Sequence, residues 1–169
     1  MPLLTQRFWS SNNWEEAETR VVHLDEDDAD GIDTMLVYIY TFETPNFYDK
    51  KQVGSHQFDA AEKCYLLGDK YDLPDFRDSG CQYILESIQD SLPAWKSRPI
   101  QTKLNWISFI RRLWSWEIEG SIGLRDALTT QLALIAHDVV KNESFLKLLR
   151  ENEEFNLAFI CALATPAKK

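Results

Sequence analysis

The chain has 169 residues, of which 44% are apolar and 27% charged, the balance of a folded globular protein. Its formal net charge of −9 would be repelled by a phosphate backbone, which argues against nucleic acid as a partner. The first residues lack the apolar core of a signal peptide, and no apolar run is long enough to cross a bilayer. We therefore expect an intracellular protein, cytoplasmic or nuclear, that does not bind membranes.

The cysteines indicate the same environment. Cys64, Cys81 and Cys161 are odd in number, far apart, and placed in apolar segments with a helical pattern. Buried free thiols in a reducing compartment explain this pattern better than disulfides do.

After a short helix over Leu3–Trp9, a strand is predicted over Thr19–Leu24, where β-branched residues favour the extended chain. A strand needs a partner for its backbone groups, and only Asn46–Tyr48 is a weak candidate. At most one short pair of strands is therefore expected, in a fold that is otherwise mostly α-helical.

An acidic segment precedes the first long predicted helix. Between residues 15 and 33 there are nine acidic residues and a single basic one. Several of these carboxylates lie where the helix begins, and the positive end of a helix dipole stabilises them there. The apolar stripe of this helix comprises Ile32, Met35, Leu36, Ile39 and Tyr40, and is widened by Val37 and Tyr38. We therefore expect a mostly buried helix, ended by Thr44-Pro45.

Two further helices follow. Ser55 is a suitable N-cap for the second, and Pro74 begins the third because proline fits a first helical turn. The second helix carries its apolar residues in two adjacent rows, which comprise Phe58, Ala61, Cys64, Tyr65, Leu67, Gly68 and Tyr71. The third has apolar or small residues in steps of four at Phe76, Gly80, Ile84 and Ile88, and the small Gly80 would let another helix approach closely.

The composition changes after Pro93 and Pro99, which bracket a linker. From Ser91 to Trp116 there are five basic residues, four tryptophans and no acidic residue. A fourth helix is predicted over about 101–117, and Gly120 and Gly123 flank a turn before a fifth. The apolar positions assigned to the later helices are Leu104, Ile107, Ile110 and Trp114 in the fourth, Leu124, Leu128, Leu132, Ile135 and Val139 in the fifth, Phe145, Leu148 and Leu149 after an Asn142 cap, and Phe155, Ala158, Phe159 and Ala162 in the last.

Basic residues interleaved with aromatic residues are typical of proteins that bind single-stranded nucleic acid, so nucleic-acid binding has to be weighed against core packing for this segment. Trp106 and Trp114 follow the helical period, which favours core packing for the rings. Arg111 and Arg112 are expected to face solvent or to pair with the acidic N-terminal face.

No motif for catalysis or metal binding is found. The three histidines lie more than thirty residues apart, and the acidic run from Asp25 lacks the glycine and glutamate of a calcium loop. Neither Ser108 nor Ser144 lies in a nucleophile motif, and His137-Asp138 are helix neighbours whose side chains point apart. We expect no enzymatic activity, no cofactor and no bound metal, with a small helical enzyme as a remote alternative.

Three segments resemble the second half of a BTB/POZ domain in order and spacing. The segment over residues 8–28 is similar to the Phe-x-Glu-Ala turn, strand and acidic corner of that family. Met35–Thr41 resembles its Leu-x-Tyr-x-Tyr-Thr helix end, and Ala61–Leu73 resembles its Ala-Asp-Lys-Tyr-x-Leu helix. In the second half of the chain, residues 124–126 and 145–155 are similar to the helical tail of many BTB proteins of filamentous fungi.

The resemblance implies a partial BTB/POZ domain over residues 1–92, with a truncated helical cluster, followed by a helical extension over residues 93–169. The opening strands and first hairpin helix of the family are missing, so we do not expect dimerisation as the family performs it. Thr41 is followed by Phe42 where the family has glycine, so the turn there is expected to differ.

The function implied by the resemblance is protein–protein interaction, with the chain as a substrate adaptor for a cullin-type ubiquitin ligase. The cullin would dock near the end of the first helix, at Met35, Tyr38 and Phe42, although core packing is the stronger interpretation for apolar residues of a helical stripe. The alternative is a scaffolding or transcription-linked protein that binds another BTB protein or its own kind.

Overall fold

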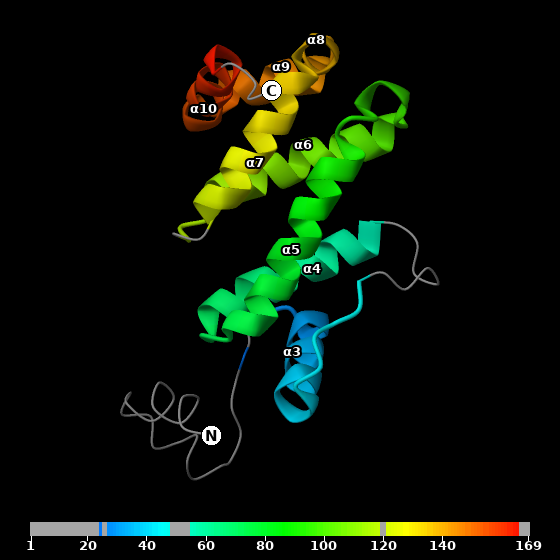
Figure 1. Ribbon diagram of the computed structural model, residues 1–169, viewed down its shortest axis with the longest axis vertical. Helices are drawn as coiled ribbons and strands as arrows, with labels where there is room; N and C mark the ends of the chain where they lie inside the picture. Colours follow the sequence, from blue (N-terminus) through cyan, green and yellow to red (C-terminus); the bar gives the residue numbers. More distant parts are fainter. Residues whose placement is uncertain (1–23, 25–26, 48–54, 119–120, 166–169) are drawn as a thin grey trace.

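The computed structural model describes Leu24 and residues 27–47, 55–118 and 121–165. Within these residues the chain is mostly α-helical and has no strand, which confirms the predicted fold class at that level (Figure 1). The helices are α3 (Ala29–Thr41), α4 (Ser55–Lys70), α5 (Pro74–Ser91), α6 (Ile100–Ser115), α7 (Ser121–Leu134), α8 (Ala136–Val139), α9 (Glu143–Glu151) and α10 (Glu153–Ala164), with a 3-10 turn η2 (Trp95–Ser97) before α6.

The short helix predicted over Leu3–Trp9 lies outside the described residues, and the predicted strands fall mostly outside them. Residues 19–23 and Tyr48 lie outside the described residues, whereas Leu24 and Asn46–Phe47 are irregular. Figure 1 shows an elongated arrangement, with α3 at one end, α8, α9 and α10 at the other, and α5, α6 and α7 between them.

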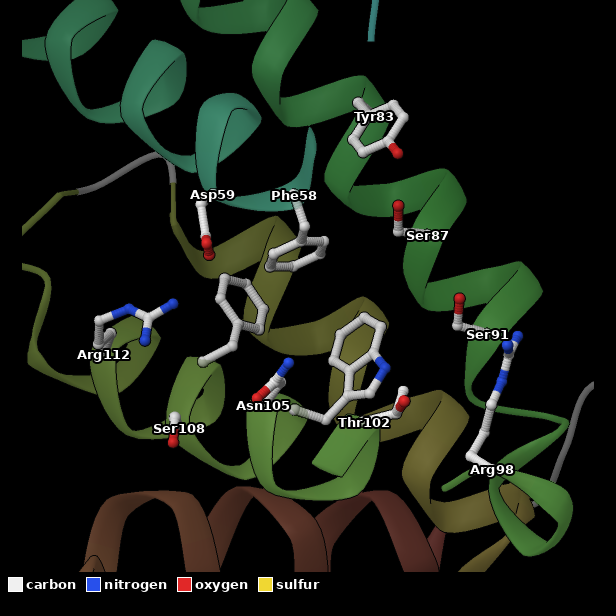
Figure 2. Close-up of a pocket in the computed structure, with 12 residues that line it drawn as sticks. Phe58, Asp59, Tyr83, Ser87, Ser91, Arg98, Thr102, Asn105, Ser108 and Arg112 are labelled. Atoms are coloured by element: carbon white, nitrogen blue, oxygen red, sulfur yellow. The ribbon is translucent and has the colours of Figure 1, made fainter. Parts of the chain in front are cut away.

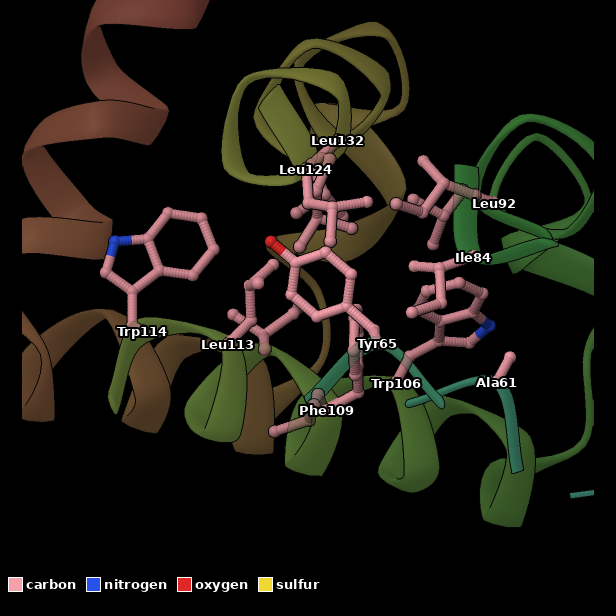
Figure 3. Packing of buried hydrophobic residues seen from close by; sticks show 14 of the residues in the cluster. Ala61, Tyr65, Ile84, Leu92, Trp106, Phe109, Leu113, Trp114, Leu124 and Leu132 are labelled. Atoms are coloured by element: carbon pink, nitrogen blue, oxygen red, sulfur yellow. The ribbon is translucent and has the colours of Figure 1, made fainter. Parts of the chain in front are cut away.

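One hydrophobic core runs along this arrangement. It joins the described residues of the first 92 positions to those of the later positions, because α5 packs against α7 and α7 packs against α10. Tyr65 of α4 lies at its centre, surrounded by residues of α5, α6 and α7 (Figure 3). Trp95, Trp106 and Trp114 are all buried, which confirms that most tryptophans of the basic segment belong to the core.

The closest helix pair is α4 and α5. As the spacing predicted, Phe76, Gly80, Ile84 and Ile88 form the buried row of α5. A methyl group at Gly80 would lie 2.4 Å from the carbonyl oxygen of Ala61, so the two backbones are in direct contact there. Glycine is required at this position by the approach of α4.

The first helix differs from its prediction in two ways. It ends at Thr41, before the expected Thr44-Pro45, and Phe42 caps it in the left-handed conformation. Its buried row is narrow and consists of Gly31, Met35 and Tyr38, because α4 and α5 cover only one side of it. The described residues leave the other side uncovered, so the expectation of a mostly buried helix was wrong.

Three smaller expectations were also wrong. Gly123 lies within the first turn of α7 rather than at the end of a turn before the helix, and the predicted fifth helix is broken at Ile135 into α7 and α8. Cys161 is exposed, whereas Cys64 is buried and Cys81 half-buried; all three are free thiols.

Asn142 caps α9 as predicted, because its Oδ1 accepts a hydrogen bond from the backbone of Phe145 at 3.1 Å.

Candidate interaction surface

The start of α3 is fixed to α4 by its acidic cap. The Asp28 Oδ1 accepts a hydrogen bond from the Gly31 amide at 2.9 Å and forms an ion pair with the Lys63 Nζ at 2.6 Å. The hydrogen bond from Lys63, followed by that from the Gly31 amide, lowers the pKa of the Asp28 carboxyl. The acidic residues that precede the helix therefore anchor it as well as cap it.

Asp27 supplies a second and more buried anchor. Its side chain is 8% exposed and accepts hydrogen bonds from the Lys70 Nζ at 2.7 Å and from the Tyr71 hydroxyl at 2.6 Å. Burial raises the pKa of Asp27, but the bonds from Lys70 and Tyr71 together outweigh it and leave the pKa lowered. Burial and the bond to Asp27 raise the pKa of Tyr71 to about 12. We call these contacts of Asp27 and Asp28 the α3 clamp.

Of the three residues expected at a partner site, two belong to the core. Met35 is 4% exposed and Tyr38 is 8% exposed, and the ring of Tyr38 packs against Phe76 of α5 at 5.1 Å between centroids. Burial, followed by the charge of Asp75, raises the pKa of the Tyr38 hydroxyl. A partner could contact Met35 or Tyr38 directly only if α3 moved.

Phe42, the third residue, is the one that faces solvent. It is 79% exposed and has a backbone φ of 58°, the left-handed conformation in which a bulky residue is strained. Its ring meets the edge of the Tyr38 ring at 6.4 Å. The residue that follows Thr41 thus has the backbone conformation typical of a glycine cap.

Three more apolar side chains are exposed on the uncovered side of α3. Tyr40 is 81%, Val37 is 59% and Leu36 is 41% exposed. We call Leu36, Val37, Tyr40 and Phe42 the α3 outer patch. From the sequence we expected Leu36, Val37 and Tyr40 to be in a buried stripe. This expectation was wrong because the helical period alone does not show which side of an apolar helix is covered.

A second apolar surface lies at the opposite end of the molecule. Phe155 and Phe159 of α10 are buried against α7 and α9, while the other side of the helix is exposed. This side, which we call the α10 outer face, comprises Leu157, Ile160, Cys161 and Leu163. Helix α10 is thus apolar on both sides, as α3 is.

A polar groove lies between these two ends. It is bounded by α5, by α6 and by the first turns of α4, and has a volume of about 620 Å³ (Figure 2). At one end the Arg112 guanidinium donates two hydrogen bonds, at 2.7 and 2.6 Å, to the Glu62 carboxylate of α4. Arg112 thus pairs with Glu62, and Arg111 pairs with Glu151 at 2.8 Å, rather than with the acidic N-terminal segment as one expectation held.

The residues considered for catalysis are not brought together. His137 and Asp138 each contact Lys141, at 2.7 and 3.6 Å, and Ser108 is exposed on α6. Burial raises the pKa of the Cys64 thiol to about 12, so it stays protonated and unreactive at neutral pH. Within the described ranges, no three His, Cys, Asp or Glu side chains are grouped to hold a metal ion.

No described helix is long and apolar enough to span a bilayer. Comparison of the chain with models of protein families, with curated proteins and with solved structures gave no match. The candidate sites are therefore defined by the geometry of this chain alone.

Proposed function

We propose that the chain is a protein-interaction module that binds a partner protein through the α3 outer patch. Phe42 is the observation that carries this proposal. Its left-handed backbone is least costly for glycine, and its exposed ring is unfavourable in water. The left-handed backbone ends α3 but does not require an aromatic ring, and bulky residues that persist in a strained conformation at a surface are a mark of functional sites.

The patch has the composition of a binding surface. Large apolar side chains that gather at one exposed site mark contacts with proteins, and aromatic residues such as Tyr40 and Phe42 contribute most to such contacts. The α3 clamp and the packing of Tyr38 on Phe76 hold the helix in place before a partner arrives. A prearranged surface loses less conformational entropy on binding.

The resemblance to BTB/POZ domains indicates the partner class. In that family a cullin docks near the helix that ends at Thr41 in this chain, so we propose a cullin as the partner and substrate adaptor as the role. The proposal moves the contact from Met35 and Tyr38 to the exposed residues of the same helix and its end.

The test is a titration of the purified chain with a purified cullin N-terminal domain, measured by isothermal titration calorimetry. Replacing Tyr40 and Phe42 together by alanine should weaken binding at least tenfold, since aromatic anchors contribute about 2 kcal/mol or more each. Ile122→Ala is the matched control, because Ile122 is 61% exposed on α7, away from the patch. Binding that survives the double substitution, or no binding by the parent chain, contradicts the proposal.

Tyr38→Ala is unsuitable as a binding variant. Removal of a buried aromatic side chain costs about 3 kcal/mol of stability, so lost binding would report unfolding of α3. Phe42 is exposed, and its replacement by alanine should change the free energy of unfolding by less than about 0.5 kcal/mol.

A second candidate function is self-association, which the α10 outer face favours. Its four side chains, Leu157, Ile160, Cys161 and Leu163, are all exposed. Multi-angle light scattering should then show a dimer at micromolar concentration, and Ile160→Glu should return it to a monomer. A monomer at every concentration rejects this candidate and leaves the α3 proposal intact.

A further inference from the structure

The polar groove between α5 and α6 has a shape suited to an extended chain. Figure 2 shows Ser91 and Arg98 at one end and Asp59 and Arg112 at the other. The wall formed by α6 runs from Thr102 to Arg112, which is about 15 Å at a rise of 1.5 Å per residue. A strand of four or five residues has the same length.

Both walls carry groups that can pair with a peptide backbone. Hydroxyl groups of Ser87 and Ser91 line the α5 side, and Thr102 and Asn105 line the α6 side. Aromatic rings form the apolar part of the lining, with Phe58 against Trp106 at 5.2 Å and against Phe109 at 4.7 Å. The groove therefore offers hydrogen bonds for a main chain and an apolar surface for a side chain.

Arg98 is the unusual group of this groove. Its Nε is buried and has no hydrogen-bond partner, and no carboxylate of the described residues lies within ion-pair distance of its guanidinium. By contrast, Arg112 in the same groove is paired with Glu62, and Arg125 donates to the carbonyl oxygens of Leu113 and Trp116. The buried Nε is closed to a ligand, but the terminal nitrogens of the same guanidinium have no acceptor among the described residues, and a carboxylate in the groove would supply one.

We propose that this groove binds a short extended peptide segment of a partner protein, with a glutamate or aspartate of that segment bound to Arg98. The planar guanidinium presents pairs of N–H donors whose spacing matches the two oxygens of a carboxylate. The rest of the segment lies along the hydroxyl groups of α5 and α6, with an apolar side chain on the aromatic rings.

The charges at the far end confine the acidic residue of the segment to the Arg98 end of the groove. Asp59 lines that end and repels a carboxylate there, while the charge of Arg112 is already neutralised by Glu62. The chain as a whole carries a net charge of −9, but charges beyond about 8 Å are largely screened at physiological salt. The local charge of Arg98 therefore decides which residue binds.

This site is separate from the α3 outer patch. The groove is lined by α4, α5, α6 and the turn before α6, and none of the four patch residues contributes to it. Failure of peptide binding would therefore leave the α3 proposal standing, and failure at the α3 outer patch would leave this one standing.

The experiment uses the full chain labelled with ¹⁵N and two pools of acetylated and amidated tetrapeptides. Each peptide contains one apolar residue and either a fixed glutamate or, in the matched pool, a fixed glutamine. The glutamate pool should shift the amide signals of Ser91, Thr102 and Asn105 and the indole signal of Trp106 in a saturable manner. The glutamine pool should bind at least tenfold more weakly.

Two variants connect the effect to the guanidinium. Arg98→Gln should weaken binding of the glutamate pool at least tenfold, while Lys96→Gln should leave it unchanged. Lys96 is the matched control because it is an exposed cation in the adjacent turn and does not line the groove. Equal binding of the two pools, or unchanged binding by Arg98→Gln, overturns the proposal.

Two further measurements complete the test. An acetate titration distinguishes binding of a peptide from binding of any free carboxylate, and a second variant gives a result that does not depend on correct folding of Arg98→Gln. Asn105→Asp, an exposed substitution on the groove wall, should weaken the glutamate pool at least threefold by repulsion. Sodium acetate should shift the same signals at least tenfold more weakly than the glutamate pool. If acetate binds as well as the peptides, or if no groove signal moves with either pool, the peptide proposal is wrong.

Discussion

Helix α4 packs against α5 on one side and against α3 on another, and these two contacts are built differently. On the side facing α5, a methyl group at Gly80 would lie 2.4 Å from the Ala61 carbonyl oxygen and 2.8 Å from the Tyr65 amide nitrogen, so backbone touches backbone. On the side facing α3, the nearest atom to a methyl group at Gly31 would be the tip of the Leu67 side chain at 2.8 Å, followed by the Lys63 Cβ at 3.4 Å, and no backbone atom lies as close. A backbone cannot give way, whereas a leucine can change its rotamer.

The two contacts also differ in polarity. The contact between α4 and α5 is made by fully buried apolar rows, but α3 is additionally held by the α3 clamp at the surface. The first contact therefore depends on shape and the second depends partly on charge. This difference is what a helix that presents a docking surface requires: a rigid support beneath it and an anchor that fixes its position.

The largest effect that would test this comparison is expected at Gly80. Gly80→Ala should lower the free energy of unfolding by about 3 kcal/mol, because α4 and α5 must separate and lose their packing. Gly31→Ala should change it by less than about 1 kcal/mol, since a better helix former compensates for the displacement of Leu67. Urea unfolding monitored by circular dichroism measures the free energy of unfolding of both variants.

Gly123→Ala provides the reference for these two variants. Gly123 lies in α7 with no atom within 4 Å of an added methyl group, so alanine should stabilise the chain by about 0.5 to 1 kcal/mol. If Gly80→Ala and Gly31→Ala have equal effects, the distinction between the two contacts of α4 is wrong.

The contact between α4 and α5 was predictable from the sequence. Residues in steps of four identified the buried row of α5, and the small Gly80 within that row indicated close approach. The core tryptophans and the Asn142 cap were likewise predictable, because helical period and capping chemistry are local properties of the sequence.

The contact between α3 and α4 was not predictable in the same way. An apolar helix has the same period whichever side is covered, so the exposure of Val37 and Tyr40 depends on which helices lie nearby. The partners of Asp27 lie more than forty positions later in the chain, and Glu62 is fifty positions from Arg112. Such pairings follow from tertiary packing and leave no local signal. The same holds for the buried Nε of Arg98, which has no hydrogen-bond partner.

A smaller effect is expected from the α3 clamp. Asp27→Asn should lower the free energy of unfolding by about 1 kcal/mol at pH 7, because the charge-assisted bond with the half-exposed Lys70 is lost. The folded-state pKa of Asp27 is lowered, so its contribution is present above the ordinary pKa of 3.8 and disappears as the pH falls through the folded value.

The pH dependence supplies the control for this variant. Urea unfolding at pH 7 and at pH 3 should show the difference between the parent chain and Asp27→Asn shrinking at the lower pH. On the alkaline side, the raised pKa of Tyr71 means that its contribution is present below pH 10 and is lost as the pH rises toward about 12. A difference that is the same at pH 7 and pH 3 would show that the carboxylate charge does not hold α3.

The smallest effect on stability is expected at Phe42, where it should be opposite in sign to the effect on binding. Phe42→Gly should stabilise the chain by about 0.5 kcal/mol, because glycine adopts a φ of 58° without strain, while binding at the α3 outer patch falls at least tenfold. Asp72→Gly is the matched control, since Asp72 has a φ of 57° and is exposed outside the patch. It should leave binding unchanged. If Phe42→Gly instead destabilises the chain, the aromatic ring is part of the fold, and the strain at the end of α3 no longer indicates a docking site.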